Sequence, residues 1–209
     1  MVERTITRRG GLADKRRAIL AGALSVFARD GYTRASIDAI AAEAGVSTRT
    51  IYNHFQDKAG LFEGVIQHSA TQVADAQIVL VDRHLWKVTD LEADLIEFGR
   101  AWATPMPDYV EHFALVRQIN AEAGHFPRAA IDAWQEIGPL RVRREIGSRM
   151  AQLADRGLLN IDDPDRAALH FTLLVAVHNP SYRGAPLADR EIDLMVRAGV
   201  RAFLHGYTH

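Results

Sequence analysis

Apolar side chains recur at steps of three and four residues along most of this chain, which is the spacing of one face of an α-helix. In the first such segment Ile19, Ala23 and Phe27 share a face, and Gly31 follows where a helix would end. No segment alternates apolar and polar residues over the length of a strand. The pattern therefore predicts an all-α protein with essentially no β-sheet.

Capping residues, prolines and glycines divide this pattern into about nine helices. Ser36 and Ser47 stand where a side-chain oxygen would cap a helix, and Thr89 with Glu92 forms a capping-box pattern. The Gly-Pro pair at residues 138–139 predicts a kink or break in a long helix. The expected helices cover residues 14–30, 36–44, 47–55, 57–81, 89–104, 107–119, 127–156, 163–178 and 189–205.

The two short helices within residues 36–55 are joined by a tight turn at residues 44–47. Ala41 is small enough for the second helix to cross close over it, and Gly45 can adopt the left-handed conformation that reverses the chain. This arrangement predicts a helix-turn-helix. Such pairs also occur in proteins that never touch DNA, so the unit alone does not establish a function.

Charge is distributed unevenly along the 209 residues. The formal net charge is −1, but residues 1–62 contain ten Lys and Arg against six Asp and Glu, whereas the remainder contains fifteen against twenty. A basic N-terminal part on an acidic remainder is expected where one end of a protein meets nucleic acid. A solvated basic face is the alternative interpretation.

Residues 17–61 carry a longer pattern around the turn. It comprises Arg17-Ala-Ile-Leu, Phe27-Ala-Arg-Asp-Gly31-Tyr32, the turn itself, and Thr50-Ile-Tyr52-Asn-His54-Phe55. This stretch resembles the TetR family of bacterial transcriptional regulators. Segments near residues 124–127 and 157–164 are similar to its AefR-like branch. The resemblance implies an N-terminal three-helix DNA-binding domain joined to a C-terminal helical domain for ligand binding and dimerisation.

We divide the chain accordingly into three segments. Residues 1–12 lack periodicity and are expected to form a flexible basic arm. Residues 13–58 would be the helix-turn-helix domain, and residues 59–209 the effector-binding and dimerisation domain. The second short helix would then be the recognition helix, lying in the major groove of DNA. The candidate DNA-binding residues are Ser36, Ser47, Thr48, Arg49, Thr50, Tyr52, His54 and Lys58.

Some of these candidates have competing interpretations. Arg49 departs from the family, which usually has glycine or another small residue there; it could bond a guanine bidentately or bind a phosphate. Lys58 follows the capping Asp57 in the first turn of a helix, where the helix dipole disfavours a cation. A phosphate bound there would interact favourably with both the helix N-terminus and the Lys58 ammonium. Tyr52 could instead be a core tyrosine, and His54 a core or capping residue.

Large aromatic residues recur on helices of the C-terminal part. They could form an ordinary core, or they could wall a cavity for an apolar molecule. The resemblance implies a small-molecule effector in this domain. The candidate pocket residues are Phe98, Trp102, Phe113, Val116, Phe126, Trp134, Phe171 and Leu174.

The last two helices carry apolar faces that predict a homodimer. One recognition helix reads too few base pairs, so a palindromic operator and a two-fold partner are expected. The resemblance implies a four-helix bundle between two chains. Burial of both faces within one chain is the alternative. The candidate interface residues are Phe171, Val175, His178, Ile192, Met195, Val196, Gly199, Val200 and Phe203.

The chain contains no cysteine, which excludes disulfides and thiolate chemistry. His170 and His178 share a helix face without a third ligand, so we expect no metal site, no cofactor and no enzyme activity. No apolar run reaches the length of a membrane span, and no secretory signal is recognisable, so we expect a cytoplasmic protein. The alternatives are an all-α metal-binding or enzymatic protein, or a protein–protein adaptor with an inert helix-turn-helix.

Overall fold

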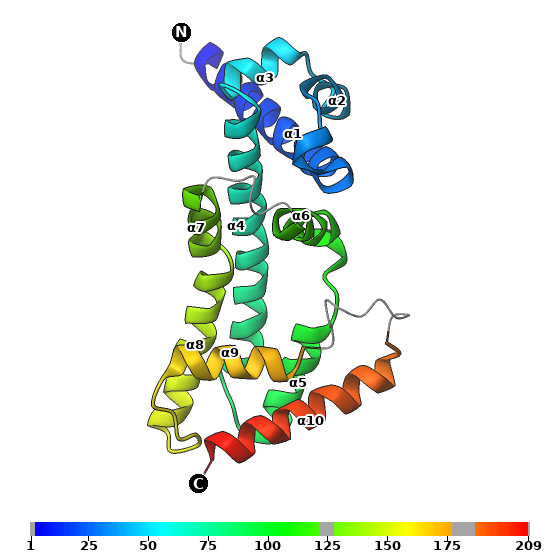
Figure 1. Cartoon of the computed structure of the whole chain (residues 1–209). Helices are drawn as coiled ribbons and strands as arrows, with labels where there is room; N and C mark the ends of the chain where they lie inside the picture. Colours follow the sequence, from blue (N-terminus) through cyan, green and yellow to red (C-terminus); the bar gives the residue numbers. More distant parts are fainter. Residues whose placement is uncertain (1–2, 122–127, 177–186, 209) are drawn as a thin grey trace. The chain divides into compact units, whose positions relative to one another are not determined.

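The computed structural model describes residues 3–121, 128–176 and 187–208, and the backbone alone for residues 3–10. Within these ranges it contains ten α-helices, one short 3-10 helix and no strand (Figure 1). The predicted all-α class is confirmed. The helices are α1 (Glu3–Arg34), α2 (Ile37–Glu43), α3 (Thr48–His54), α4 (Lys58–Leu85), α5 (Leu91–Ala103), η1 (Pro107–Tyr109), α6 (Val110–Ala121), α7 (Arg128–Ile137), α8 (Pro139–Asp155), α9 (Pro164–Leu174) and α10 (Asp189–Tyr207).

The tenth helix comes from the Gly-Pro pair at residues 138–139. We expected a kink or break there, and the chain indeed ends α7 before Gly138 and begins α8 at Pro139. Proline has no N–H to continue the helical bonding, so it suits the first position of a new helix. A Cβ at Gly138 would lie 3.2 Å from the Cβ of Ala70, so the break also brings this backbone close to α4.

Helix α5 corrects the predicted capping box. Its N-cap is Asp90 rather than Thr89, and the Asp90 carboxylate accepts a hydrogen bond of 3.0 Å from the N–H of Ala93. The carboxylate of Asp94, not of Glu92, accepts the N–H groups of Thr89 (2.7 Å) and Asp90 (3.0 Å). An aspartate caps at least as well as a threonine, so the cap moved one residue along.

The structure also differs from the expected arm at residues 1–12, because α1 already begins at Glu3. Hydrophobic periodicity reports which face of a helix is buried, and residues 11–18 are all exposed. The exposed stretch at residues 11–18 therefore carries no apolar pattern to detect. The first buried residue of α1 is Ile19 among those whose side chains are described.

The chain forms two compact units. Unit 1 comprises residues 1–73 and 107–138, and unit 2 comprises residues 74–106 and 139–209. In unit 1, α1 packs against α2 and α6. Its core contains an aromatic cluster in which the ring centroids of Phe27 and Phe62 lie 5.0 Å apart and those of Tyr32 and Phe62 lie 4.8 Å apart. The boundaries of these units differ from those of the three segments predicted from the sequence. The division of functions among those segments stays a prediction.

In unit 2, α10 packs against α5 and α9, and α9 packs against α8 (Figure 1). The rings of Phe98 and Phe171 stack at 5.3 Å, and Phe203 meets Phe171 edge-on at 5.3 Å. At Gly199 the backbones of α10 and α9 approach so closely that a Cβ would collide with the carbonyl oxygen of Leu174. Glycine is therefore required at this crossing.

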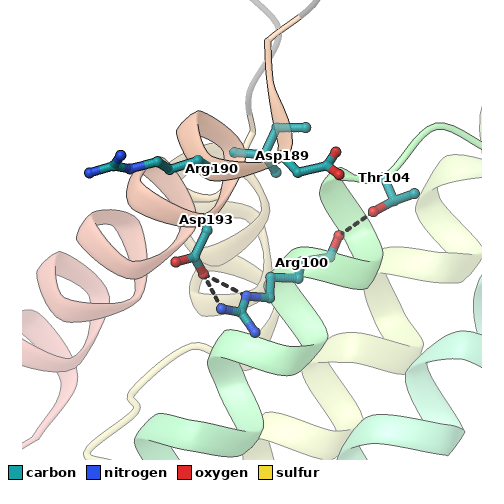
Figure 2. A pocket seen from close by; sticks show the side chains of 6 residues that line it. Arg100, Thr104, Asp189, Arg190 and Asp193 are labelled. Atoms are coloured by element: carbon teal, nitrogen blue, oxygen red, sulfur yellow. Dashed lines mark hydrogen bonds and ion pairs between the residues drawn. The ribbon is translucent and has the colours of Figure 1, made fainter.

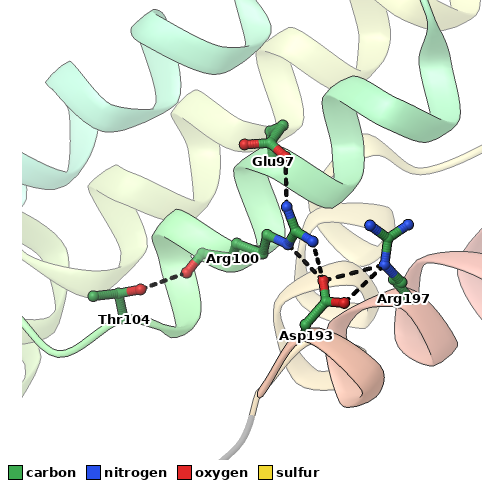
Figure 3. Close-up of polar contacts among 5 residues, drawn as sticks. All are labelled: Glu97, Arg100, Thr104, Asp193 and Arg197. Carbon is green, nitrogen blue, oxygen red and sulfur yellow. Dashed lines mark hydrogen bonds and ion pairs between the residues drawn. The ribbon is translucent and has the colours of Figure 1, made fainter. Parts of the chain in front are cut away.

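A polar network joins α5 to α10 at the surface of unit 2 (Figure 3). The Arg100 guanidinium donates to Asp193 and, at 2.8 Å, to Glu97, while Arg197 donates to Asp193 at 3.0 Å. The hydrogen bonds from Arg100 and then Arg197 lower the pKa of the Asp193 carboxyl. This carboxylate therefore remains charged at neutral pH between its two cations.

Within the described residues, no helix is both long and apolar enough to cross a membrane.

Candidate nucleic-acid interface

The turn between α2 and α3 has the geometry expected of a helix-turn-helix. Gly45 has φ of 64°, in the left-handed region that disfavours other residues. The N–H of Val46 donates to the carbonyl of Ala41 at 3.0 Å, which closes the turn. Gly22 of α1 faces this turn, and a Cβ there would lie 2.8 Å from the backbone nitrogen of Ala44. The turn is thus held against α1 by backbone-to-backbone proximity.

Both predicted caps of the short helices are present. The Ser36 hydroxyl accepts the N–H of Ala39 at 3.1 Å, and the Ser47 hydroxyl accepts the N–H of Thr50 at 3.2 Å. The hydroxyls of Ser47 and Thr50 also hydrogen-bond to each other at 2.9 Å. These side chains therefore stabilise the start of α3, whether or not they also contact DNA.

Helix α3 is anchored on one side and open on the other. Ile51 is buried against the core of unit 1, whereas Arg49 is exposed and Tyr52 keeps 54% of its surface accessible. Tyr52 is therefore no core residue, although the sequence left that interpretation open. Thr48 and His54 are half-buried at the two ends of the helix. The open face presents a guanidinium and a phenol, groups that bond phosphates and base edges.

Lys58 and Arg16 each contact an aromatic ring of unit 1. The Lys58 ammonium is 4.6 Å from the Tyr32 ring centroid and 3.4 Å from the Thr33 carbonyl oxygen. The Arg16 guanidinium is 5.1 Å from the ring centroid of Phe55, the C-cap residue of α3. These cation–ring contacts could not be predicted from the sequence, because the partners lie 26 and 39 positions away in the chain.

Asp57 caps α4 as expected, accepting the N–H of Gly60 at 2.8 Å.

The predicted pocket residues divide between the two units. Val116, Phe113 and Trp134 belong to unit 1, whereas Phe98, Trp102, Phe171 and Leu174 belong to unit 2. Phe126 lies outside the described residues. Phe98 and Phe171 are fully buried in a stacked core, and Leu174 is 42% exposed. Whether these aromatic residues converge on one cavity stays a prediction.

Two hollows lie among the described residues of unit 2. A polar one of about 430 Å³ lies between the end of α5 and the start of α10, lined by Arg100, Thr104, Asp189 and Asp193 among others (Figure 2). A mostly apolar one of about 250 Å³ lies between α4, α5, α8 and α9, and Trp102 lines it. Trp102 is thus the predicted pocket residue that meets a cavity in the described part of unit 2.

Most of the predicted interface residues are buried within one chain. Six of them are packed inside unit 2: Phe171, Val175, Val196, Gly199, Val200 and Phe203. Their contact with a second chain stays a prediction. The apolar faces are real, but α5, α9 and α10 cover much of them for one another. Ile192 is half-buried, Met195 is 44% exposed, and His178 lies outside the described residues.

Other apolar side chains on the same two helices are exposed instead. Leu173 of α9 is 64% accessible, and Leu194 of α10 is 57% accessible. His170 does not form a metal site with its neighbours in the described ranges; its Nδ1 lies 2.7 Å from the hydroxyl of Tyr207.

Family models match both parts of the chain. Residues 19–65 match the model described as bacterial regulatory proteins of the TetR family, and residues 93–209 match the C-terminal domain of AefR-like transcriptional repressors. The second match alone covers more than half of the chain.

Individual proteins show the same likeness. The chain is 29% identical over 109 residues to the transcriptional repressor Rv1474c of Mycobacterium tuberculosis, covering 44% of this chain and 58% of that one. It is 33% identical over 93 residues to the repressor AcnR of Corynebacterium diphtheriae, covering 39% and 49%. The chain thus spans about half the length of these curated relatives.

Solved structures match over a greater length. A protein from Mesorhizobium loti, assigned to the TetR family of regulators, has a TM-score of 0.82 and 29% identity, covering 95% of this chain and 98% of that one. The flavonoid-responsive regulator FrrA has a TM-score of 0.63 and 27% identity, covering 93% and 97%.

Proposed function

Because this chain belongs to the TetR family of bacterial regulatory proteins, we propose that it is a repressor that binds a palindromic operator as a dimer and releases it when a small apolar molecule binds. Proteins of this family are DNA-binding transcription regulators and not enzymes. Binding to a chromosomal operator would place the protein in the cytoplasm.

The observation that carries the proposal is the open face of α3. Its buried side is fixed by Ile51 and its start by the Ser47 cap, so Arg49 and Tyr52 project from a rigid, short helix. A helix held in this way can enter the major groove with its N-terminal residues near base edges. Arg49 would read a guanine or hold a phosphate, and Lys58 would hold a phosphate at the start of α4.

The partner chain is proposed on geometric grounds. Two half-sites separated by one helical turn of DNA, about 34–36 Å, require two recognition helices related by a two-fold axis. The exposed leucines Leu173 and Leu194 and the partly exposed Met195 supply apolar surface on α9 and α10 for that contact. A protein–protein adaptor would need the same surface but no operator.

Support for an effector comes from the cavity in unit 2 and from one structural neighbour. That neighbour, FrrA, is named as a flavonoid-responsive regulator. Binding of such a molecule would weaken DNA binding by the same factor by which DNA weakens binding of the molecule.

Salt-dependent binding to duplex DNA tests this proposal against the adaptor and the enzyme. The purified chain is titrated into labelled random duplex at increasing salt, and fluorescence anisotropy is measured. A regulator should lose affinity linearly on a double-logarithmic plot, with a slope of several units. An adaptor or enzyme should show no duplex binding even at low salt.

A further inference from the structure

The apolar hollow of unit 2 contains one cationic side chain. Its volume is about 250 Å³, slightly below the roughly 300–1,000 Å³ of sites for drug-sized ligands. Trp102, Ile146 and Leu169 form apolar walls on three different helices. The remaining lining residues are Gln77, Pro139, Leu140, Val142, Arg143 and Thr172.

The Arg143 side chain has a buried N–H donor without an acceptor. Its Nε is shielded from solvent and has no hydrogen-bond acceptor in the described part of the chain, where no ion pair of this side chain is found either. Other arginines of α8 are neutralised: Arg141 lies 2.7 Å from Asp75, and Arg149 lies 2.6 Å from Asp82. The Nε of Arg149 is likewise buried without an acceptor, but the Arg149 guanidinium pairs with Asp82 and Glu145. Arg143 is therefore set apart by its guanidinium, for which the described part of the chain supplies no carboxylate partner.

The second hollow of unit 2 lacks this property. There the Arg100 guanidinium is turned onto Asp193 and also bonds Glu97, so its charge is compensated by carboxylates of the same chain (Figures 2 and 3). An anion arriving at that hollow would meet Asp189 and Asp193 as well as the arginines. The apolar hollow has Arg143 and no acidic residue among its lining residues.

We propose that the cavity between α4, α5, α8 and α9 binds a small organic acid. Its apolar body would lie between Trp102, Ile146 and Leu169, and its carboxylate would accept from Arg143. The Gln77 amide supplies a further N–H donor at the wall. The Thr172 hydroxyl cannot help, since it already donates to the carbonyl oxygens of Ala168 and Leu169 at 3.0 Å each. This assignment rests on the proposed function, in which an effector acts on this domain.

The chemistry distinguishes three kinds of molecule. A carboxylate can accept from the terminal nitrogens of the Arg143 guanidinium and neutralise its charge, through charge-assisted hydrogen bonds that are stronger than neutral ones. A neutral molecule of the same shape leaves the charge uncompensated. A cation is repelled by Arg143, because no lining carboxylate offsets it.

A matched series of three ligands tests the assignment on the full chain. We would measure dissociation constants of 3-phenylpropionate, 3-phenylpropanamide and 3-phenylpropylamine by calorimetry, with tryptophan fluorescence as a second readout. The carboxylate should bind at least about tenfold more tightly than the amide, and the amine should not bind. Naphthoate and octanoate extend the series to a wider and a longer apolar body.

Two substitutions on α8 separate a specific site from general charge. Arg143→Met keeps the apolar stem of the side chain without the guanidinium and should abolish the preference for the carboxylate over the amide. Arg144→Met removes the same charge from the adjacent, exposed position and should leave that preference unchanged. Circular dichroism and melting temperature check that both variants are folded. Should Arg143→Met fail to fold, Arg143→Gln removes the charge with a polar side chain and should likewise abolish the preference.

The outcomes separate this inference from the proposed function. The inference is overturned if no carboxylate of the series binds more tightly than about 1 mM, or if Arg143→Met binds the carboxylate as wild type does. In either case duplex binding can persist and the repressor proposal stands. Arg143-dependent binding of the carboxylate by a chain that never binds duplex DNA supports the site and contradicts the repressor.

Discussion

His112 gives unit 1 a pH-dependent stability. Its Nδ1 lies 3.1 Å from the Ser69 hydroxyl, and burial lowers the pKa of the imidazole to about 4. The unfolded chain, with a pKa near 6.5, binds the proton first as pH falls. Stability from the neutral ring is therefore complete above about pH 6.5 and is lost progressively down to about pH 4, by about 1–2 kcal/mol between pH 7 and pH 5.

Chemical denaturation at pH 7 and pH 5 measures this loss. His112→Gln can keep a hydrogen bond to Ser69 but cannot titrate, so its stability should change less between the two pH values. An equal pH dependence of wild type and His112→Gln would show that another group is responsible.

Ser36, Ser47 and Asp57 were predictable as caps, because a capping oxygen and its N–H partner lie within three residues of each other in the chain. The contact of Lys58 with Tyr32 was not predictable, because only tertiary packing brings together residues so far apart in the sequence. The same limit applies to the environment of the Arg143 guanidinium.

Arg49 and Lys58 should affect DNA binding in different ways. If Arg49 reads a guanine, Arg49→Ala relaxes base preference at one operator position and costs about 1–3 kcal/mol there. Lys58→Ala should instead weaken binding evenly across sequences and lower the salt slope by about one unit. Competition among operator variants at two salt concentrations measures both effects. An unchanged preference in Arg49→Ala would assign Arg49 to the phosphate backbone.

At the scale of elements, the sequence predicted helices well and their partners poorly. The apolar face of α10 was evident, but periodicity cannot say whether α5 and α9 of the same chain or a second chain covers it. The structure assigns Val196, Val200 and Phe203 to the chain's own core. The composition of unit 1 could not be predicted either, because the chain returns to this unit at residues 107–138 after forming part of unit 2.

Two glycines of α10 provide a matched test of helix packing. Gly199→Ala places a Cβ against the Leu174 carbonyl and should destabilise the protein by about 1–3 kcal/mol or more. Gly206 has no neighbouring atom within 4 Å of a Cβ, so Gly206→Ala should stabilise the helix by about 0.5–1 kcal/mol. Denaturant midpoints measure both changes, and a tolerated Gly199→Ala would contradict the close crossing of α9 and α10.

For the whole molecule, substitutions on exposed apolar positions test the proposed dimer. Substitutions at Gly199 or Val200 would disturb the core of unit 2 and cannot decide it. The double variant Leu173→Glu with Leu194→Glu adds charge to exposed apolar positions and should dissociate a dimer while keeping each chain folded. Val79→Glu, on an equally exposed position of α4, is the control and should leave the dimer intact.

Light scattering at micromolar concentration measures the molecular mass of each variant in solution. Wild type and Val79→Glu should have twice the 23.2 kDa mass of the chain, and the double variant should have that of one chain. A wild-type mass of one chain would refute the dimer. A double variant that still dimerises would place the interface elsewhere.

A two-fold dimer whose α3 helices enter the major groove should select one specific operator. Sequencing of the duplexes that the purified protein retains from a random library measures this selection. We expect an enriched inverted repeat whose half-sites are separated by about one helical turn. Retained duplexes without any common sequence, or with a single unpaired half-site, would refute operator reading by a dimer.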